Sequence, residues 1–240
     1  MKKTKLESIT VLISSCDAYS ILWPSFSKWF FKNWKIECEL IFVSETQKHP
    51  DFKTILTGKI PWAHRNLVAL SQIKSDYVFW LLEDYFLTRE FHVEEMERYL
   101  NDFIEKKMDR LQLAPQGVHK NYDFDVKNTF KPEFNYYNIP ANHKYSISMQ
   151  PSIWRKDYIL KVLNKDYTPW EFELIGSINN SSSNIFIDKS IVCHPYFNVA
   201  KKKHVRNLTW AISKIDKIIE AVFYKKLPFN FNKGYKKFIK

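Results

Sequence analysis

Two adjacent carboxylates, Glu83 and Asp84, directly follow a strongly apolar run. This run, residues 76–82, is rich in β-branched and aromatic side chains, which is typical of a buried strand in a parallel sheet. Ligands of such sheets bind beyond the carboxyl ends of the strands. Two acids at this point suit a divalent cation, Mn2+ or Mg2+, and through it a diphosphate. The alternative is structural: Asp84 caps the next turn and Glu83 is solvated.

The residues around this run alternate between strand-like and helix-like patterns. The expected elements, in chain order, are residues 9–15 (strand), 20–33 (helix), 38–44 (strand), 62–73 (helix), 76–82 (strand) and 93–107 (helix). In the last helix, the side chains expected to face inward are Val93, Met96, Leu100, Phe103 and Ile104. This alternation predicts an α/β fold with a doubly wound, mostly parallel central sheet flanked by helices.

The second half of the chain has a weaker pattern. The expected strands are residues 110–113, 145–149 and 185–193, and the expected short helix is residues 155–163. Residues 115–143 are expected to be irregular, and their six aromatic rings either stack on sugar faces or simply pack. Thr168, Pro169 and Glu171 have the spacing of a helix start, in which Thr168 is the cap and Glu171 completes a capping box.

The composition argues against several classes of protein. Only four of the 240 residues are glycine, and the chain has neither a phosphate-cradling P-loop nor a dinucleotide-binding fingerprint. Cys16, Cys38 and Cys193 are widely spaced, which favours a reduced cytosolic compartment over a disulfide framework or a zinc site. The first apolar run is too short for a signal peptide, and no segment has the roughly 20 apolar residues that span a bilayer. We expect a soluble or peripheral protein.

The net charge of +11 is concentrated at the C-terminal end. Residues 201–240 hold twelve Lys and Arg against two acids, whereas residues 1–200 hold 25 against 24. The nearly neutral body argues against a nucleic-acid groove. Residues 208–223 have apolar side chains at helical spacing, and aromatic and basic residues follow them. A basic amphipathic helix with such a tail suits an anionic membrane surface; the alternative is a helix docked on the body.

Residues 65–70 (RNLVAL), 75–78 (SDYV) and 81–84 (LLED) carry a resemblance to a known family. They resemble the core of nucleotide-sugar-dependent glycosyltransferases of the GT-A fold, in which a helix containing Arg and Asn precedes the strand with the acidic metal-binding motif. Residues 150–155 and 169–173 also look like small bacterial transferases of capsule and lipopolysaccharide assembly. The sequence departs from the usual Asp-X-Asp motif, since Tyr85 stands where a second aspartate often lies.

The resemblance implies roles for the residues that bind the donor. Ser14, Asp17 and Glu45 would contact the nucleoside, and Arg65 would pair with phosphate oxygens or hold Asp84 in place. For Asp17 and Glu45 the alternative is a turn cap, and for Arg65 it is a surface ion pair.

The remaining ligand roles concern the metal, the diphosphate and the acceptor. Glu83 and Asp84 would share a divalent cation, or the enzyme would use none. His194 would be a metal or phosphate ligand, or else a turn residue, and Lys202 would close over the diphosphate or begin the basic membrane face. By the same resemblance, the acceptor would be bound by Gln150, Trp154 and Trp170.

The transfer also needs a base. In an inverting transfer, a carboxylate takes the proton of the acceptor hydroxyl while that oxygen attacks the anomeric carbon. The candidates are Glu171 and Glu173, which point about 200° apart on a helix, so at most one faces the site. Because Glu171 has a role in the capping box, we favour Glu173; the alternative is that Glu173 is a solvated helix residue.

These features together predict a cytoplasmic, hexosyltransferase-like enzyme, peripheral to the inner face of the membrane. It would move a sugar from a nucleotide-sugar donor to a growing cell-surface glycan on a lipid carrier. Residues 1–207 would form the GT-A-like domain, divided near residue 114 into nucleotide-binding and acceptor-binding halves, and residues 208–240 the basic helix and tail. The alternative is a non-catalytic glycan- or membrane-binding protein on a degenerate fold. A glycoside hydrolase is disfavoured, since adjacent acids cannot flank a scissile bond.

Overall fold

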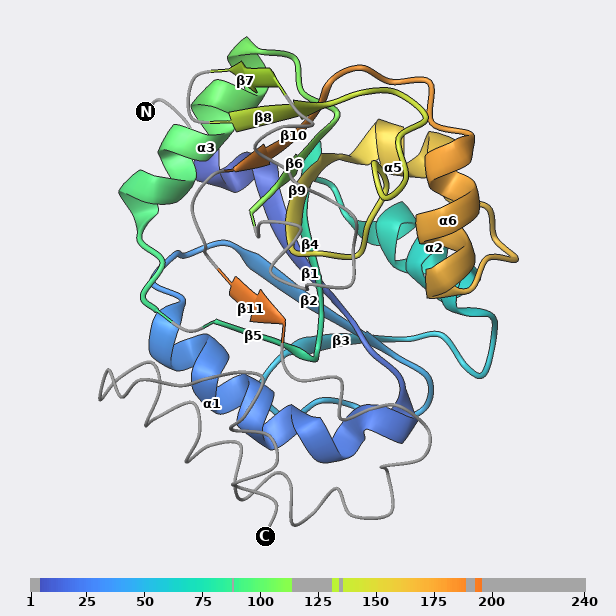
Figure 1. The fold of residues 1–240 in the computed structure, drawn as a ribbon. Coiled ribbons are helices and arrows are strands. Elements are labelled where there is room, and N and C mark those ends of the chain that lie inside the picture. The colour runs from blue at the N-terminus through green and yellow to red at the C-terminus, as the bar shows by residue number, and fades with distance from the viewer. Residues whose placement is uncertain (1–4, 88, 114–130, 134–135, 189–192, 196–240) are drawn as a thin grey trace, which may run out of the picture.

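Figure 1 shows the computed structural model of the chain, which is built around a nine-stranded sheet. The structure describes residues 5–87, 89–113, 131–133, 136–188 and 193–195. Across the sheet, the strand order is β3-β2-β1-β4-β9-β6-β10-β8-β7. The bounds of these strands, in the same order, are Lys53–Leu56, Glu39–Ser44, Ile9–Ser14, Tyr77–Leu82, Ser152–Arg155, Arg110–Gln112, Ile185–Asp188, Tyr136–Ile139 and Lys131–Glu133.

The predicted mostly parallel sheet is confirmed. Seven of the nine strands run in one direction, and only β9 and β8 are reversed. The central strand β1 pairs in parallel with β2 on one side and with β4 on the other. The carboxyl ends of these three strands therefore meet at the same edge of the sheet, as the sequence predicted for the acidic pair.

Helices cover both faces of the sheet, so the predicted doubly wound architecture is also confirmed (Figure 1). The core on one face includes Val11 and Ile13 of β1, and the core on the other includes Leu12. The helices of the first face are α1 (Trp23–Asn33) and α3 (Val93–Glu105); those of the second are α2 (Trp62–Gln72), α5 (Lys156–Val162) and α6 (Pro169–Ile178). Two 3-10 helices, Lys5–Ser8 and Asp17–Leu22, precede and follow β1.

The capping box of α6 was predicted correctly, whereas the buried face of α3 was predicted only in part. The capping box of α6 is confirmed: the hydroxyl of Thr168 accepts from the backbone N–H of Glu171, whose carboxylate accepts from the backbone N–H of Thr168. In α3 the inward position assigned to Ile104 is wrong, because this side chain is 37% exposed and Tyr99 is buried instead. Tyr99 shares the stripe of Met96, Leu100 and Phe103, whereas Ile104 lies further around the helix.

The second half of the sheet differs most from the prediction. Residues 131–133 and 136–139 were expected to be irregular but form β7 and β8, and β7 is the edge strand of the sheet. An edge strand tolerates Pro132, which has no backbone N–H to donate to a neighbouring strand. The expected strand at 145–149 is instead a series of turns and bends, and Tyr145 has φ +63°. The strand that does form, β9, lies antiparallel between β4 and β6.

A short second sheet extends the carboxyl end of β4. It consists of β5 (Tyr85–Leu87) and β11 (Cys193–Pro195), which run antiparallel. Within the described residues, we find no helix that has the length and hydropathy to cross a membrane. The basic segment of residues 208–240 lies outside the described part of the chain.

Candidate functional site

The candidate site begins where three parallel strands end. In the registers of the sheet, Ser14 of β1 pairs with Val43 of β2 on one side and with Leu82 of β4 on the other. The next residues along each strand, among them Asp17, Glu45 and Glu83, therefore leave the sheet at the same edge. Ser14 itself is 1% exposed, and its hydroxyl has no hydrogen-bond partner among the described residues.

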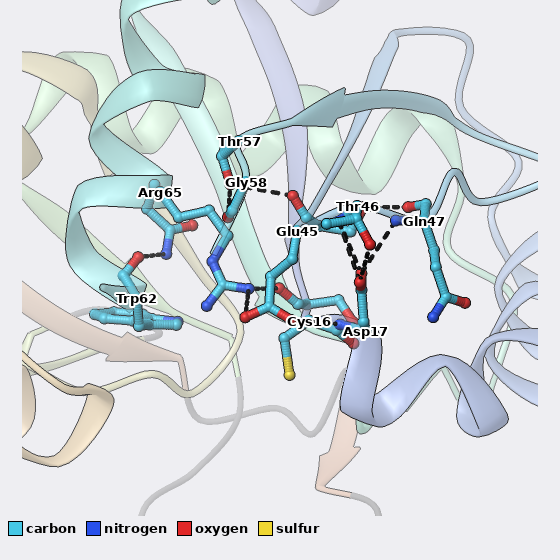
Figure 2. A network of polar contacts seen from close by, with 12 residues as sticks. Cys16, Asp17, Glu45, Thr46, Gln47, Thr57, Gly58, Trp62 and Arg65 are labelled. Carbon is cyan, nitrogen blue, oxygen red and sulfur yellow. Dashed lines mark hydrogen bonds and ion pairs between the residues drawn. The ribbon is translucent and has the colours of Figure 1, made fainter. Parts of the chain in front are cut away.

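Asp17 is occupied by contacts with its own chain. Its carboxylate accepts hydrogen bonds from the backbone N–H and hydroxyl of Thr46 and from the backbone N–H of Gln47 (Figure 2). Although slight burial alone would raise it, the pKa of Asp17 is lowered by these hydrogen bonds. The cap that was the alternative for Asp17 is thus present, and Asp17 orders the turn after β2.

Glu45 and Arg65 form a second part of the same network (Figure 2). One carboxylate oxygen of Glu45 accepts from the backbone N–H of Asp17 at 3.2 Å, and the other lies 3.5 Å from Nη1 of Arg65. Arg65 Nη1 also donates to the carbonyl of Ser15 at 3.0 Å. Only 5% of Arg65 is exposed, so this is no surface ion pair, and its Nε has no partner among the described residues. The arginine therefore joins α2 to the ends of β1 and β2.

Glu83 is a buried acid rather than a solvated one, since only 5% of it is exposed. Burial raises its pKa well above the ordinary value, and the charge of Asp84 raises it further. A hydrogen bond from Ser15 and the charge of Arg65 act in the opposite direction. The guanidinium and the Ser15 hydroxyl thus only partly compensate the buried carboxylate, which favours the approach of a further cation or a proton.

Asp84 presents the unsatisfied atom of the pair. Its Oδ1 is buried and finds no hydrogen-bond partner within the described ranges. Burial raises the pKa of Asp84 to about 6, and the negative charge of Glu173 raises it as well. Glu173, which is distant in sequence, is thus electrostatically coupled to the acidic pair.

Glu173 faces the site from α6. Its carboxylate accepts from the backbone N–H of Met149 at 2.7 Å and bonds the hydroxyl of Ser148. Burial raises its pKa, while these two hydrogen bonds and the charge of Arg110 lower it. Glu173 is therefore no solvated helix residue. Glu171, by contrast, is exposed and held in the capping box, so the structure gives it no contact with the site.

Aromatic packing fixes α6 and Glu173 against the sheet. Phe172, the residue before Glu173, is fully buried against Trp62 of α2, Trp80 of β4 and Trp154 of β9. Trp154 is 1% exposed and also lies beneath the guanidinium of Arg110. The predicted contact of Trp154 with an acceptor is therefore corrected: with both faces covered by the core, its ring has no surface left for a sugar.

The other predicted acceptor and metal residues have different positions. Trp170 is 71% exposed at the start of α6, and Gln150 is half-buried in the segment that follows Met149. The backbone of His194 pairs with Phe86 of β5, close in sequence to Asp84, but the side chain of His194 lies outside the described residues. Lys202 also lies outside them.

Several residues at the site were not predicted. Cys16 and Tyr19 border the acidic pair: burial raises both pKa values, that of Tyr19 to about 12, and the charge of Glu83 raises both further. Arg110 and Ser148 were missed as neighbours of Glu173. For Cys16 and Tyr19, their closeness to the end of the first strand was an available signal, whereas only the tertiary structure brings the other two to the site.

A divalent cation, expected from the acidic pair and from the resemblance, would take its protein ligands from these residues. Among the described residues, no group of three or more His, Cys, Asp or Glu side chains could hold a metal ion. Mg2+ sites, however, commonly use one or two carboxylates and take their other ligands from substrate phosphates and water. The unpartnered oxygen of Asp84, with Glu83 beside it, suits this kind of site.

Comparison with protein-family models and with curated proteins finds no match. Solved structures do match the fold. TarS from S. aureus, a glycosyltransferase, matches over 97% of this chain and 46% of its own, with 12% identity and a TM-score of 0.51. Its residues 1–349 match over 97% of this chain and 75% of that one, with 13% identity and a TM-score of 0.54. The same TarS fragment in complex with UDP-GlcNAc matches over 89% of this chain and 66% of its own, with 10% identity and a TM-score of 0.53.

At these identities the similarity concerns the fold, and the chain spans about half of the longer TarS chain. The sheet and its helices are those of a GT-A-like glycosyltransferase fold, as the sequence predicted.

Proposed function

We propose that this protein is a glycosyltransferase that takes a sugar from a nucleotide-diphosphate donor. The observation that carries the proposal is the buried oxygen of Asp84, unpartnered among the described residues, which follows the buried carboxylate of Glu83 at the end of β4. Asp84 lies at the strand ends, where sheets of this kind bind ligands, and Glu173 approaches from α6, close enough for its charge to raise the pKa of Asp84. Acids with raised pKa values at one site are a mark of functional sites.

The donor would lie along the carboxyl ends of β1, β2 and β4. Support for this class of donor comes from TarS, whose fragment was solved in complex with UDP-GlcNAc and with UDP. In our proposal Glu45 and Ser14 contact the nucleoside, and Arg65 offers its unpartnered Nε to the donor. Asp17 acts indirectly, since its carboxylate holds the turn that presents Glu45.

A divalent cation would be held by Asp84, supported by Glu83. When bound, it would neutralise charge that develops on the departing diphosphate. Arg65 contributes a permanent positive charge near the same strand ends.

Glu173 would act as the base in an inverting transfer. Its carboxylate would accept the proton of the acceptor hydroxyl, whose oxygen forms the new bond to the anomeric carbon as the bond to the nucleoside diphosphate breaks. Burial supports this role, because the raised pKa of Glu173 brings it closer to neutral pH. The backbone N–H of Met149 fixes one oxygen of the carboxylate, so its direction is set.

The acceptor would be a growing cell-surface glycan on a lipid diphosphate. Trp170, three residues before the proposed base Glu173, has an exposed aromatic ring that suits stacking on a sugar.

The basic residues 201–240 would bring the enzyme to the inner face of the membrane, with His194 and Lys202 near the diphosphate. Deletion of residues 208–240 should release the protein from anionic vesicles, and continued binding would refute this part of the proposal.

The general proposal is tested by measuring the unfolding temperature of the protein with a panel of nucleotide sugars. A ligand that binds only the folded state raises this temperature. We expect one nucleoside family to stabilise the protein and its sugar to be transferred to an acceptor. Stabilisation without transfer to any acceptor, or no stabilisation at all, would favour a non-catalytic binding protein on this fold.

A further inference from the structure

Arg110 is a fully buried arginine and the first residue of β6 (Arg110–Gln112). Its Nη1 donates to the carbonyl of Ser146 at 2.9 Å, and its Nη2 donates to the carbonyl of Ser148 at 3.1 Å and to the side chain of Gln112 at 2.5 Å. Burial lowers the pKa of Arg110 to about 9, and the largest opposing effect is the negative charge of Glu173. A guanidinium in this position is costly unless its donors are used and a negative charge is near.

The segment that Arg110 holds is the one that binds Glu173. Residues 146–149 are not a strand, so their carbonyl groups do not pair with a neighbouring strand. Two of these carbonyls accept from Arg110 instead, and the same short segment donates to Glu173 through the backbone N–H of Met149 and the hydroxyl of Ser148. The contacts thus run from β6 through an irregular segment to the carboxylate on α6.

A second anchor ties this segment to α6 without any charge. The hydroxyl of Ser177 accepts from the backbone N–H of Ile147 at 3.0 Å and donates to its carbonyl at 3.1 Å. Ser177 therefore fixes the middle of the segment, whereas Arg110 fixes the residues on both sides. Loss of Arg110 would leave two buried carbonyls without their donors, and the segment would rearrange to find others.

We infer that Arg110 is a positioning residue for Glu173: its guanidinium holds residues 146–149 in the conformation in which Met149 and Ser148 donate to that carboxylate. For catalysis this inference rests on the proposed role of Glu173 as base. The expected consequence is a defect in turnover rather than in donor binding, because Arg110 reaches the reaction only through Glu173.

The kinetic test introduces Arg110→Met into the wild type and into Glu173→Gln. In the wild type we expect kcat to fall about tenfold or more, with the KM for the donor unchanged. In the Glu173→Gln background the same change should have little further effect, since the residue through which Arg110 acts is already gone. An equal loss in both backgrounds would overturn the inference and leave Arg110 a general structural residue.

Two further variants keep the test decisive. Arg110→Lys retains the charge but cannot bond both carbonyls in the same way. It should give an intermediate kcat and show the same dependence on Glu173, and it replaces the Met variant if that variant does not fold. The matched control is Arg155→Met, which removes an arginine that pairs with Asp109 and Asp157. This control should leave kcat unchanged.

A titration that needs no activity separates this inference from the proposed function. Glu173 faces Arg110 from β6, Asp84 from the turn after β4, and the donors of Ser148 and Met149. By carbon-detected NMR of labelled glutamate, assigned with Glu173→Gln, Arg110→Met should move the titration of Glu173 to higher pH, and Arg155→Met should not. An unchanged titration in Arg110→Met would overturn the inference, even if no transferase activity exists.

Discussion

The backbone N–H of Asp17 donates to the carboxylate of Glu45 at 3.2 Å, and the carboxylate of Asp17 accepts in return from the turn that follows Glu45. The two acids thus join the ends of β1 and β2 through hydrogen bonds in both directions (Figure 2). This arrangement explains how two neighbouring carboxylates can lie at one edge of the sheet. Each is satisfied by backbone donors, and Glu45 also lies beside Arg65.

We therefore expect Asp17→Asn to loosen the turn that presents Glu45. The amide keeps the shape of the carboxylate but has one acceptor oxygen and no charge, so it cannot accept all of the present hydrogen bonds. The free energy of unfolding should fall by about 1 kcal/mol, and donor binding should weaken. The control is Lys53→Ala, which breaks the exposed 2.8 Å pair with Glu39 and should cost less than about 0.5 kcal/mol. Unchanged donor binding in Asp17→Asn would contradict this role.

The two glutamates of α6 provide a matched pair of variants. Glu173→Gln should lower kcat by about 100-fold or more while donor affinity stays the same, because the amide cannot accept the proton. Glu171→Gln should leave both quantities unchanged, since glutamine also completes a capping box. The measurements are initial rates and donor titrations of the two variants. If Glu173→Gln turned over at the wild-type rate, Glu173 would not be the base.

The acidic pair should make the unliganded protein less stable as the pH rises. Burial raises the pKa of Asp84 to about 6 from an ordinary 3.8, and burial followed by the charge of Asp84 raises that of Glu83. A raised pKa means that the folded state binds protons more tightly than the unfolded state. The stability gained in this way is fully present below the unfolded pKa and is lost as the pH rises through the folded pKa.

Thermal unfolding should therefore occur at a lower temperature at pH 7.5 than at pH 5. In Glu83→Gln with Asp84→Asn this difference should be reduced by the equivalent of about 1 kcal/mol or more. Equal pH dependence of the wild type and the double variant would show that the pair does not titrate in this range.

Trp170 and Trp154 should respond oppositely to replacement by alanine. Trp170→Ala should raise the KM for the acceptor and leave the unfolding temperature and the donor KM unchanged, since its ring is 71% exposed. Trp154→Ala should lower the free energy of unfolding by about 3–5 kcal/mol, because it leaves a cavity in the core. An unchanged acceptor KM in Trp170→Ala would remove this residue from the acceptor site.

The first half of the fold could be predicted because each of its elements has a local signal. The runs that form β1, β2 and β4 are mostly apolar, and the helices between them have clear periodicity. The polar residues after each run could then be placed at one edge by the rule for parallel strands. The capping box of α6 was likewise visible in three residues.

The rest depends on contacts between distant segments. β9 has four residues and acquires its strand conformation between β4 and β6, neither of which adjoins it in the chain. Arg110 could not be recognised from the sequence, since arginine is rarely buried and its partners are backbone carbonyls that any residue would supply. The burial of Trp154 could not be predicted from the sequence either, because tryptophan is found both in sugar-binding sites and in hydrophobic cores.

The most direct test of the proposed donor site is calorimetric titration of nucleoside diphosphates with and without Mn2+. The wild type should bind one of them, more tightly when the cation is present, and Glu83→Gln with Asp84→Asn should lose the cation-dependent part of this binding while remaining folded. Binding that is the same in the double variant, or no binding to any nucleoside diphosphate, would contradict the assignment of the donor site to these strand ends.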